Sequence, residues 1–444
     1  MTALHEPHAE DFQSLDELHA LQDRKLQALG LRLAGSPEWC AHLAKAGVKP
    51  GDLRDRTSLA AMPTLEKADL RERYPFPMLT VPVEQVARFC ATSGTTGLPV
   101  MFGFTRHDWE VTLVRQLARI YRTVNLRPGD RVYQGFGYGL WIGGPSMDAA
   151  LSAYGAVNFP VGPGRADLVV RWLADHGYTV TTMSPLWLMT LIATAKNAGF
   201  DPARQWKLRL GVFGGQSVSA TFRQEIEAQM PSGFMAHNNY GTTEAGGPIL
   251  SISCPHSHAH DQMHLINEDS VLTEIVDPKT LQPVGPGEVG EVLITTLDKQ
   301  ASPVVRWRTR DLVRRADRPY ACACGRKAFA LIGRIIGRSD DMLKVRGVIV
   351  FPTQVEDVIA GMECLAKEAW QIYIDGDGAS LDRIEVAVER LPSATMGTDA
   401  LAAEVAARLR ARLGLTVNVT CHVEGKLPRY EAKAARVIRR AATH

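Results

Sequence analysis

The sequence predicts an α/β protein, with a large multi-layer N-terminal domain followed by a small α+β C-terminal domain. In the first half of the chain, helical patterns alternate with short β-rich runs at 132–136, 179–183 and 210–213. This alternation is typical of helices packed in layers against a sheet. The 444 residues exceed the size of one ordinary core, so two or more domains are expected.

The pattern changes near residue 338, beyond which strands and helices form a compact α+β arrangement. We therefore expect one domain over residues 1–337 and a second over residues 338–444. The elements expected in the second domain are the strands 371–374, 384–389 and 417–423 and the amphipathic helix 399–413.

Near the N-terminus, Ser14 and Glu17 have the spacing of a capping box, in which each side chain accepts the other residue's backbone N–H. Leucines at helical spacing follow as far as Gly30. The pattern predicts a helix of about four turns that begins after Ser14 and ends before Gly30.

Composition argues against several classes of partner. The net charge is +2, from 50 basic and 48 acidic residues, so neither nucleic acid nor an anionic membrane is an expected partner. The chain shows no charged-then-apolar leader and no apolar stretch long enough to cross a bilayer, which favours a cytoplasmic protein. Seven cysteines in a chain of this length do not make a disulfide framework.

The most informative segment is the loop 92–97, Thr-Ser-Gly-Thr-Thr-Gly, which follows a mostly apolar run. Glycines let the backbone approach a ligand closely, and the freed N–H groups and hydroxyls can then hold an anion, most often a phosphate. The alternative is a plain turn. The candidate anion-binding residues are Ser93, Gly94, Thr95, Thr96 and Gly97.

Two more loops have the composition of ligand sites. The segment 214–216, Gly-Gly-Gln, directly follows a β-rich run, where α/β folds bind their ligands. The segment 239–247 is rich in glycines and hydroxyls and adds a carboxylate, Glu244. Beside a phosphate loop this carboxylate would hold Mg²⁺, which prefers oxygen ligands shared with phosphates. The alternative is a hairpin turn with a surface glutamate.

Asp311, Asp340 and Lys433 are candidates that the residues alone leave open. Asp311 follows three closely spaced arginines, so it either joins a structural ion-pair network or accepts hydrogen bonds from a ribose diol. Asp340 lies between glycines at the expected domain boundary, which suits a hinge or a solvated linker turn. Lys433 begins a basic helix near the C-terminus and by itself indicates only a solvated lysine.

In this order and spacing, the segments resemble the adenylate-forming superfamily, and most closely its phenylacetate–CoA ligase family. The resemblance extends from about residue 53 to residue 440. It implies the architecture of adenylate-forming enzymes, with a large domain that binds ATP and the acid and a small mobile domain. The motifs that match lie at 92–97, 240–244, 308–312, 337–343 and 345–352.

The resemblance implies a role for each matching residue. Residues 93–97 would cradle the β- and γ-phosphates of ATP, and Asp311 would bind the ribose with Arg338 nearby. Asp340 would be the hinge. Lys433, Glu244 and Arg338 would take part in catalysis, with Lys433 contacting the carboxylate and the α-phosphate and Glu244 holding Mg²⁺. The residues on the adenine side would be Gly214, Gly215, Gln216, Asn239, Tyr240, Gly241, Thr242 and Thr243.

The implied reaction is AMP-forming ligation of an acid to a thiol, with ATP, Mg²⁺ and coenzyme A. The acid would be an arylacetate such as phenylacetate or indole-3-acetate, and relatives suggest a homodimer. Transfer to a carrier protein or an amine is one alternative. A non-catalytic nucleotide binder is another, because Leu98 replaces the lysine common in the family's loop. The expected acid pocket consists of Tyr138, Trp141, Ile142, Gly214 and Pro248.

A zinc site is expected as well. Cys322 and Cys324 form a tight pair, and Cys254 is followed by several histidines. Cysteine and histidine are the ligands that zinc prefers, and structural sites have four of them. Some relatives resemble the chain in this pattern, which implies a structural Zn²⁺ held by Cys254, His260, Cys322 and Cys324. His264 is the alternative to His260, and reduced, metal-free thiols are the alternative to zinc.

Overall fold

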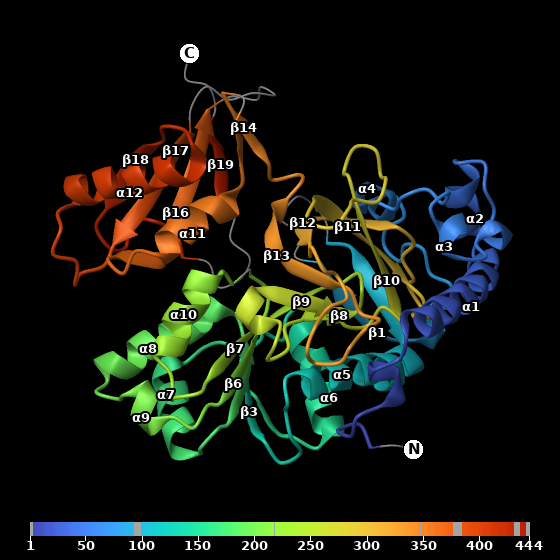
Figure 1. Ribbon diagram of the computed structural model, residues 1–444, viewed down its shortest axis with the longest axis horizontal. Helices are drawn as coiled ribbons and strands as arrows, with labels where there is room; N and C mark the ends of the chain where they lie inside the picture. Colours follow the sequence, from blue (N-terminus) through green and yellow to red (C-terminus); the bar gives the residue numbers. More distant parts are fainter. Residues whose placement is uncertain are drawn as a thin grey trace. The chain divides into compact units, whose positions relative to one another are not determined.

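The computed structural model describes residues 3–92, 99–216, 218–346, 348–375, 384–429 and 436–440 (Figure 1). The chain divides into two compact units. The first comprises Met1–Val218, Ile226–Thr309 and Val313–Arg334, and the second comprises Ser219–Glu225, Arg310–Leu312 and Ile335–His444. The main stretch of the second unit thus begins three residues before the boundary expected at 338. The predicted combination of an α/β and an α+β domain is confirmed.

Among the described residues, eleven strands form one continuous sheet in the order β10-β11-β12-β13-β9-β8-β7-β6-β5-β3-β4. The half from β4 to β7 is parallel, whereas β7, β8, β9 and β13 pair in antiparallel fashion. The parallel strands are β3 (Arg131–Gln134), β4 (Val157–Pro160), β5 (Val180–Met183), β6 (Leu210–Phe213) and β7 (Met235–Thr242). The others are β8 (Gly247–Ile252), β9 (Gln262–Leu265), β10 (Val271–Val276), β11 (Val289–Thr296), β12 (Trp307–Arg315) and β13 (Leu331–Arg338).

Helices cover both faces of the parallel half of the sheet. Every residue of β5 and β6 is buried, as expected for parallel strands with helices on both sides. Figure 1 shows α7, α8 and α9 on one side of these strands and α5 and α6 on the other. The expected strands at 132–136, 179–183 and 210–213 are confirmed as β3, β5 and β6. The helices are α5 (Val114–Thr123), α6 (Gly143–Tyr154), α7 (Ala166–Asp175), α8 (Pro185–Asn197), α9 (Pro202–Gln205) and α10 (Ala220–Ala228).

The N-terminal helix α1 (Leu15–Ala34) begins as predicted and ends later than predicted. Ser14 and Glu17 form the expected capping box. The helix passes through Gly30, which was expected to follow its last residue, and ends at Ala34. A Cβ at Gly30 would lie 2.7 Å from the carbonyl oxygen of Pro50, so this glycine allows a close approach of two segments and does not terminate the helix. The short helices α2 (Pro37–Ala44), α3 (Arg56–Leu59) and α4 (Lys67–Arg71) follow.

A separate antiparallel pair, β1 (Val86–Ala91) and β2 (Met101–Thr105), surrounds the glycine- and hydroxyl-rich loop. Ala91 pairs with Met101, and the next residue, Thr92, exchanges hydrogen bonds with Val100 at 3.0 and 3.2 Å. The loop therefore connects two strands of a closed hairpin. Its residues Ser93, Gly94, Thr95, Thr96, Gly97 and Leu98 lie outside the described part of the chain.

The second unit contains a sheet in the order β18-β17-β16-β19 with two helices packed against it. Leu401, Val405 and Leu409 of the longer helix lie in one apolar core with Val386 and Val388 of the sheet. The three strands and the helix expected in this region are confirmed. The elements are β16 (Leu365–Asp375), β17 (Ile384–Arg390), β18 (Asn418–His422), β19 (Val437–Arg440), α11 (Pro352–Ala360) and α12 (Thr398–Leu413), with the small pair β14 (Leu343–Val345) and β15 (Val348–Val350).

The helices in the described part of the chain are all too short or too polar to cross a membrane.

Candidate active site

Residues expected on the adenine side lie at the adjacent ends of β6 and β7. Phe213 is in register with Asn238, so the loop that begins at Gly214 starts beside Asn239. The ideal Cβ position of Gly214 is 3.3 Å from the carbonyl oxygen of Asn239, which leaves little room for a larger residue. Gly214, Gly215 and Gln216 follow β6, and Asn239, Tyr240, Gly241 and Thr242 are the last residues of β7.

Asn239 also has a structural task. Its side-chain amide donates to the carbonyl oxygens of Pro248 and Ser251 at 3.2 and 3.1 Å, which ties β7 to β8. Asn239 is 5% exposed, and its amide N–H groups are therefore used within the hairpin. The side chain of Asn239 thus stabilises the β7–β8 hairpin, while its backbone lies next to Gly214.

Glu244 lies in the turn that joins β7 to β8. The hydroxyl of Thr242 accepts the N–H of Ala245 at 3.2 Å, and the N–H of Gly246 donates to Thr243 at 3.2 Å. The hairpin turn that the sequence left open as an alternative is therefore present. Its half-buried Glu244 keeps a carboxylate at the end of the hairpin, which is compatible with a Mg²⁺ ligand.

The residues expected to form the acid pocket come from three segments: the stretch 138–142, the residue after β6 and the start of β8. Tyr138 and Trp141 are partly exposed, at 39% and 37%, whereas Ile142 is buried. The side chain of Ile142 lies against the β7–β8 turn, because an ideal Cβ at Gly247 is 3.7 Å from it. Burial raises the pKa of Tyr138 to about 12, and Asp148 adds to the shift, so this hydroxyl stays protonated at neutral pH. It accepts a hydrogen bond from the Gln134 amide at 2.9 Å.

Phe136 is an apolar residue of this region that the sequence did not single out. The ideal Cβ of Gly214 lies 3.6 Å from its ring, so Phe136 stands next to this expected pocket position. The sequence placed Phe136 inside a β-rich run, whereas the strand ends at Gln134 and leaves Phe136 in the loop. That loop position after a parallel strand was the available signal.

In the second unit, Arg338 joins the carboxylates expected to serve as ribose ligand and hinge. Its guanidinium lies 3.3 Å from Asp311 and binds Asp340 through two nitrogens, both at 2.9 Å. Burial lowers the pKa of Arg338, but the surrounding carboxylates outweigh burial and raise it above its ordinary value. Asp311 therefore belongs to an ion-pair network, the alternative that the residues alone had left open, and a bound ribose would have to contact it within that network.

The Cys/His cluster expected to bind zinc is present with one different residue. The candidate ligand atoms of Cys254, His264, Cys322 and Cys324 all lie within 4.8 Å of one another. Cys254 and Cys322 have their sulfur atoms 3.6 Å apart, and His264 Nε2 is 3.3 Å from the Cys324 sulfur. His260, the first choice from the sequence, is exposed in a short 3₁₀ turn and does not belong to this cluster. His264, the second choice, lies on β9 and is fully buried.

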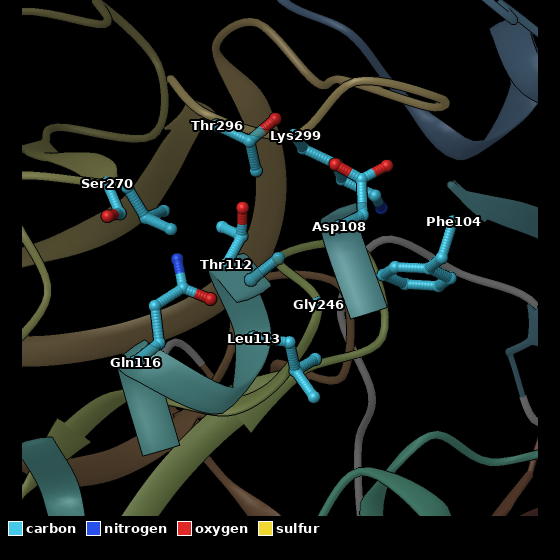
Figure 2. Close-up of a pocket in the computed structure, with 11 residues that line it drawn as sticks. Phe104, Asp108, Thr112, Leu113, Gln116, Gly246, Ser270, Thr296 and Lys299 are labelled. Carbon is cyan, nitrogen blue, oxygen red and sulfur yellow. The ribbon is translucent and has the colours of Figure 1, made fainter. Parts of the chain in front are cut away.

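Lys299 and Asp108 form a buried polar group beside the Glu244 turn that the sequence did not reveal. Figure 2 shows both side chains with Phe104 and Gly246 around a cavity large enough for about one water molecule. Burial lowers the pKa of Lys299 to about 8, although Asp108, Glu244 and Cys90 act in the opposite direction. Lys299 is 55 residues from Glu244 in the sequence, and no local pattern could have joined them.

Comparisons with known proteins agree with this arrangement. The family model described as AMP-binding enzyme matches residues 27–297, and the model of the AMP-binding enzyme C-terminal domain matches residues 347–440. The phenylacetate-coenzyme A ligase of Escherichia coli K12 is 35% identical over 96% of this chain and 95% of its own length. The chain belongs to the phenylacetate–coenzyme A ligase family. This confirms the membership that the motifs had predicted.

Other members of this family are similar over nearly their whole length. The phenylacetate-coenzyme A ligase of Aromatoleum evansii is 36% identical over 91% of this chain and 90% of its own. The enzyme of the same name from Thermus thermophilus is 33% identical over 95% and 96%. A solved structure, 2-hydroxyisobutyryl-CoA ligase in the postadenylation state, superposes with a TM-score of 0.87 at 24% identity, over 98% of this chain and 94% of that chain. That likeness concerns the fold, which is the adenylate-forming fold.

Proposed function

We propose that the protein is an ATP-dependent aryl-acid–coenzyme A ligase. The observation that carries the proposal is the 35% identity, over nearly the full length of both chains, to a phenylacetate-coenzyme A ligase. Two features of the fold support it: the β1–β2 hairpin, which flanks the expected phosphate-binding residues 93–97, and the adjacent ends of β6 and β7. ATP and coenzyme A are the substrates that accompany the acid in this family.

The reaction has two steps. A carboxylate oxygen attacks the α-phosphorus of ATP, the bond to the β-phosphate oxygen breaks, and pyrophosphate leaves. The thiol of coenzyme A then attacks the acyl carbon of the adenylate, loses its proton and displaces AMP. Because the first transition state is strongly anionic, groups that offer N–H donors or positive charge lower its energy, by roughly 3–4 kcal/mol for one well-placed donor.

The residues proposed for the first step come from segments that are far apart in the sequence. Residues 93–97 would hold the β- and γ-phosphates, the backbone around Gly214 and Asn239 would face the adenine, and Asp311 with Arg338 would bind the ribose. Glu244 would hold Mg²⁺, which neutralises phosphate charge when it is bound. Lys433 would contact the carboxylate and the α-phosphate, and Asp340 would be the hinge between the two steps. Residues 93–97 and Lys433 lie outside the described residues, so their roles rest on the motifs.

The proposed acid is an arylacetate, with phenylacetate as the first choice and indole-3-acetate as a second. Phe136 lies against Gly214 and Ile142 lies against Gly247, which precedes Pro248, and the partly exposed Tyr138 and Trp141 lie between them in the sequence. Together they would offer the aromatic and apolar surface that a pocket for a flat ring requires. The test is AMP release by the purified protein with ATP, Mg²⁺ and coenzyme A over a panel of arylacetates. Absence of AMP with every acid of the panel would contradict the proposed function.

A structural Zn²⁺ is proposed at Cys254, His264, Cys322 and Cys324. Three sulfurs and one imidazole nitrogen within 4.8 Å of one another suit a tetrahedral zinc ion. The ion would fasten the segment after β8 and the segment that precedes β13 to β9. Metal analysis of the purified protein tests the site. The expected cytoplasmic location and homodimer stay predictions, which fractionation and light scattering would check.

A further inference from the structure

Lys299 carries a buried ammonium group that the proposed reaction does not use. The residue is 5% exposed, and no carboxylate among the described residues lies within ion-pair distance of its Nζ. Nζ lies 4.9 and 4.4 Å from the ring centroids of Phe102 and Phe104, and it donates one hydrogen bond, at 3.2 Å, to the carbonyl oxygen of Glu244. A buried charge with so few partners lowers stability, which suggests that the group is retained for another purpose.

Hydrogen bonds hold the segment that carries Lys299 against Asp108 and against β2, the second strand of the β1–β2 hairpin. The buried Asp108 carboxylate accepts the backbone N–H groups of Gln300 and Ala301 at 2.7 and 3.0 Å. The hydroxyl of Ser302 accepts the N–H of Gly103, on β2, at 2.8 Å. Phe102 and Phe104 are alternate residues of β2 and present one face to the ammonium. The backbone that follows Lys299 and the Lys299 side chain are therefore both held in place.

The turn that Lys299 contacts contains two glycines in backbone conformations that other residues rarely adopt. Gly246 and Gly247 have φ values of 117° and 127°, in the region that glycine enters readily. Two short-range hydrogen bonds close the turn, from Ala245 to Thr242 and from Gly246 to Thr243. The hydrogen bond from Lys299 adds a long-range contact on the backbone of Glu244 itself. Figure 2 shows Lys299 and Asp108 beside the loop that carries Gly246.

We propose that Lys299 is a positioning residue for adenylation, which holds the backbone of Glu244 so that its carboxylate is oriented for Mg²⁺. This proposal rests on the proposed function, because it takes Glu244 as the Mg²⁺ ligand. At one end of the contact, Lys299 is held against β2 of the β1–β2 hairpin, and at the other end lies the glycine-containing turn that carries Glu244. Lys299 thereby sets the position of the metal ligand relative to the hairpin that would hold the phosphates.

The test compares Lys299→Met with Lys25→Met in phenylacetate-dependent ATP–pyrophosphate exchange as Mg²⁺ is varied. Methionine keeps the length that packs on the two rings and removes the charge. Lys25 is a matched control, because its Nζ binds Asp298 and the carbonyl oxygen of Asp269 at 2.7 and 2.8 Å and so secures the same chain segment without contacting Glu244. We expect Lys299→Met to raise the Mg²⁺ concentration for half-maximal rate roughly tenfold, since a charged hydrogen bond is lost. The KM for the acid should stay within about twofold of wild type.

A double variant distinguishes positioning from a purely structural role. If Lys299 acts through Glu244, then Lys299→Met added to Glu244→Gln lowers the exchange rate no further than Glu244→Gln alone. Additive losses would overturn the proposal, as would an unchanged Mg²⁺ dependence in a folded Lys299→Met protein. Lys299→Gln is the second variant should methionine not fold, and failure of both to fold would assign Lys299 to the fold and overturn the proposal.

Wild-type protein separates this inference from the proposed function. If wild type catalyses no exchange with any aryl acid, the proposed function fails, and the role of Lys299 in it fails as well. If wild type is active and depends on Mg²⁺, the variants test Lys299 alone.

Discussion

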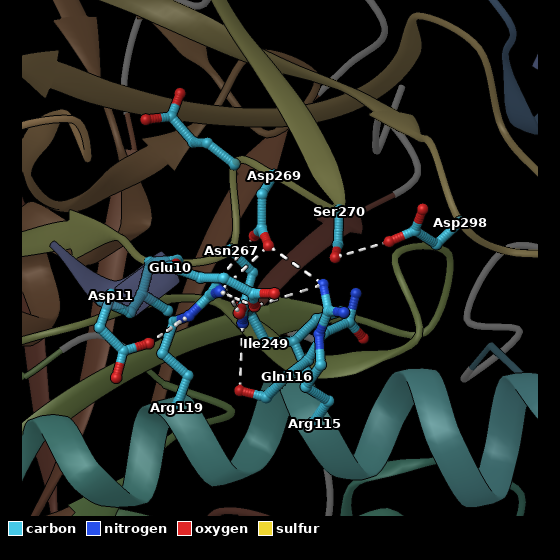
Figure 3. Close-up of polar contacts among 12 residues, drawn as sticks. Glu10, Asp11, Arg115, Gln116, Arg119, Ile249, Asn267, Asp269, Ser270 and Asp298 are labelled. Atoms are coloured by element: carbon cyan, nitrogen blue, oxygen red, sulfur yellow. Dashed lines mark hydrogen bonds and ion pairs between the residues drawn. The ribbon is translucent and has the colours of Figure 1, made fainter. Parts of the chain in front are cut away.

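Arg119 and Asp269 form a buried ion pair in which two guanidinium nitrogens reach the carboxylate, at 2.5 and 3.0 Å. Both side chains are nearly inaccessible to water, and Arg119 also binds the buried Asp11 at 2.8 Å. Figure 3 shows how these contacts join the N-terminal segment around Asp11, the helix α5 and the turn before β10. Because Asp11 and Asp269 both bind the Arg119 guanidinium, we expect Arg119 to contribute strongly to the free energy of unfolding.

We predict that Arg119→Met lowers the free energy of unfolding by about 3–5 kcal/mol, because it leaves two buried carboxylates without their full compensation. Arg106→Met is the control, since Arg106 forms an exposed pair with Glu110 at 2.9 Å and should change stability by less than about 0.5 kcal/mol. Urea unfolding followed by circular dichroism measures both. Equal stability of the two variants would contradict the importance of the buried network.

The lowered pKa of Lys299 predicts a pH dependence of stability with a definite sign. Burial lowers this pKa from 10.5 to about 8, so between these two values the unfolded chain binds a proton that the folded chain does not. Stability from this group therefore rises as pH increases through that window. Between pH 7 and pH 9.5 the wild type should gain about 2 kcal/mol relative to Lys299→Met. Urea unfolding of both proteins at the two pH values tests this, and a constant difference would contradict it.

The zinc proposal predicts a stoichiometric metal content that depends on the cluster. Cys324→Ser should lose most of the zinc and show a lower melting temperature, because one of four ligands is replaced by a weak one. Cys40→Ser, at a half-buried cysteine outside the cluster, should retain the metal of wild type. Elemental analysis and thermal unfolding measure the two effects. A wild-type protein purified without a chelator that contains no zinc would remove the site.

The His260→Ala and His264→Ala variants extend this test to the choice of the histidine ligand. His264→Ala should lose zinc, and His260→Ala should not, since His260 is exposed and lies outside the cluster. The opposite result would restore the first choice made from the sequence.

The bidentate pair of Arg338 and Asp340 predicts a selective effect on the second half-reaction. Asp340→Asn weakens a contact that is about half exposed, so stability should change by less than about 1 kcal/mol. If Asp340 is the hinge, adenylation measured by pyrophosphate exchange should stay near wild type while thioester formation slows. Parallel loss of both rates would assign Asp340 to adenylation.

Local patterns were sufficient for much of the fold. The Ser14–Glu17 capping box and the alternation at Ile384–Arg390 depend on neighbouring residues, so the sequence reveals them directly. Gly30 misled the prediction of the α1 terminus, because what it allows is the approach of Pro50, a segment twenty residues away. His260 misled the choice of ligand because spacing to Cys254 says nothing about which histidine a strand turns inward, as β9 does for His264.

The contacts that could not be predicted are those between distant segments. The hydrogen bond from Lys299 to Glu244 and the rings of Phe102 and Phe104 beside it join three parts of the chain that no periodicity relates. The same holds for Arg119, whose carboxylate partners lie 108 and 150 residues away. A buried lysine carries no signal of its own in the sequence until its neighbours are known.

The central claim is that the protein activates an aryl acid as an adenylate, and isotope exchange between pyrophosphate and ATP tests it most directly. The account predicts exchange that requires both phenylacetate and Mg²⁺ and proceeds without coenzyme A, followed by phenylacetyl-CoA and AMP once coenzyme A is added. Exchange with no aryl acid in a broad panel, or formation of ADP in place of AMP, would contradict it.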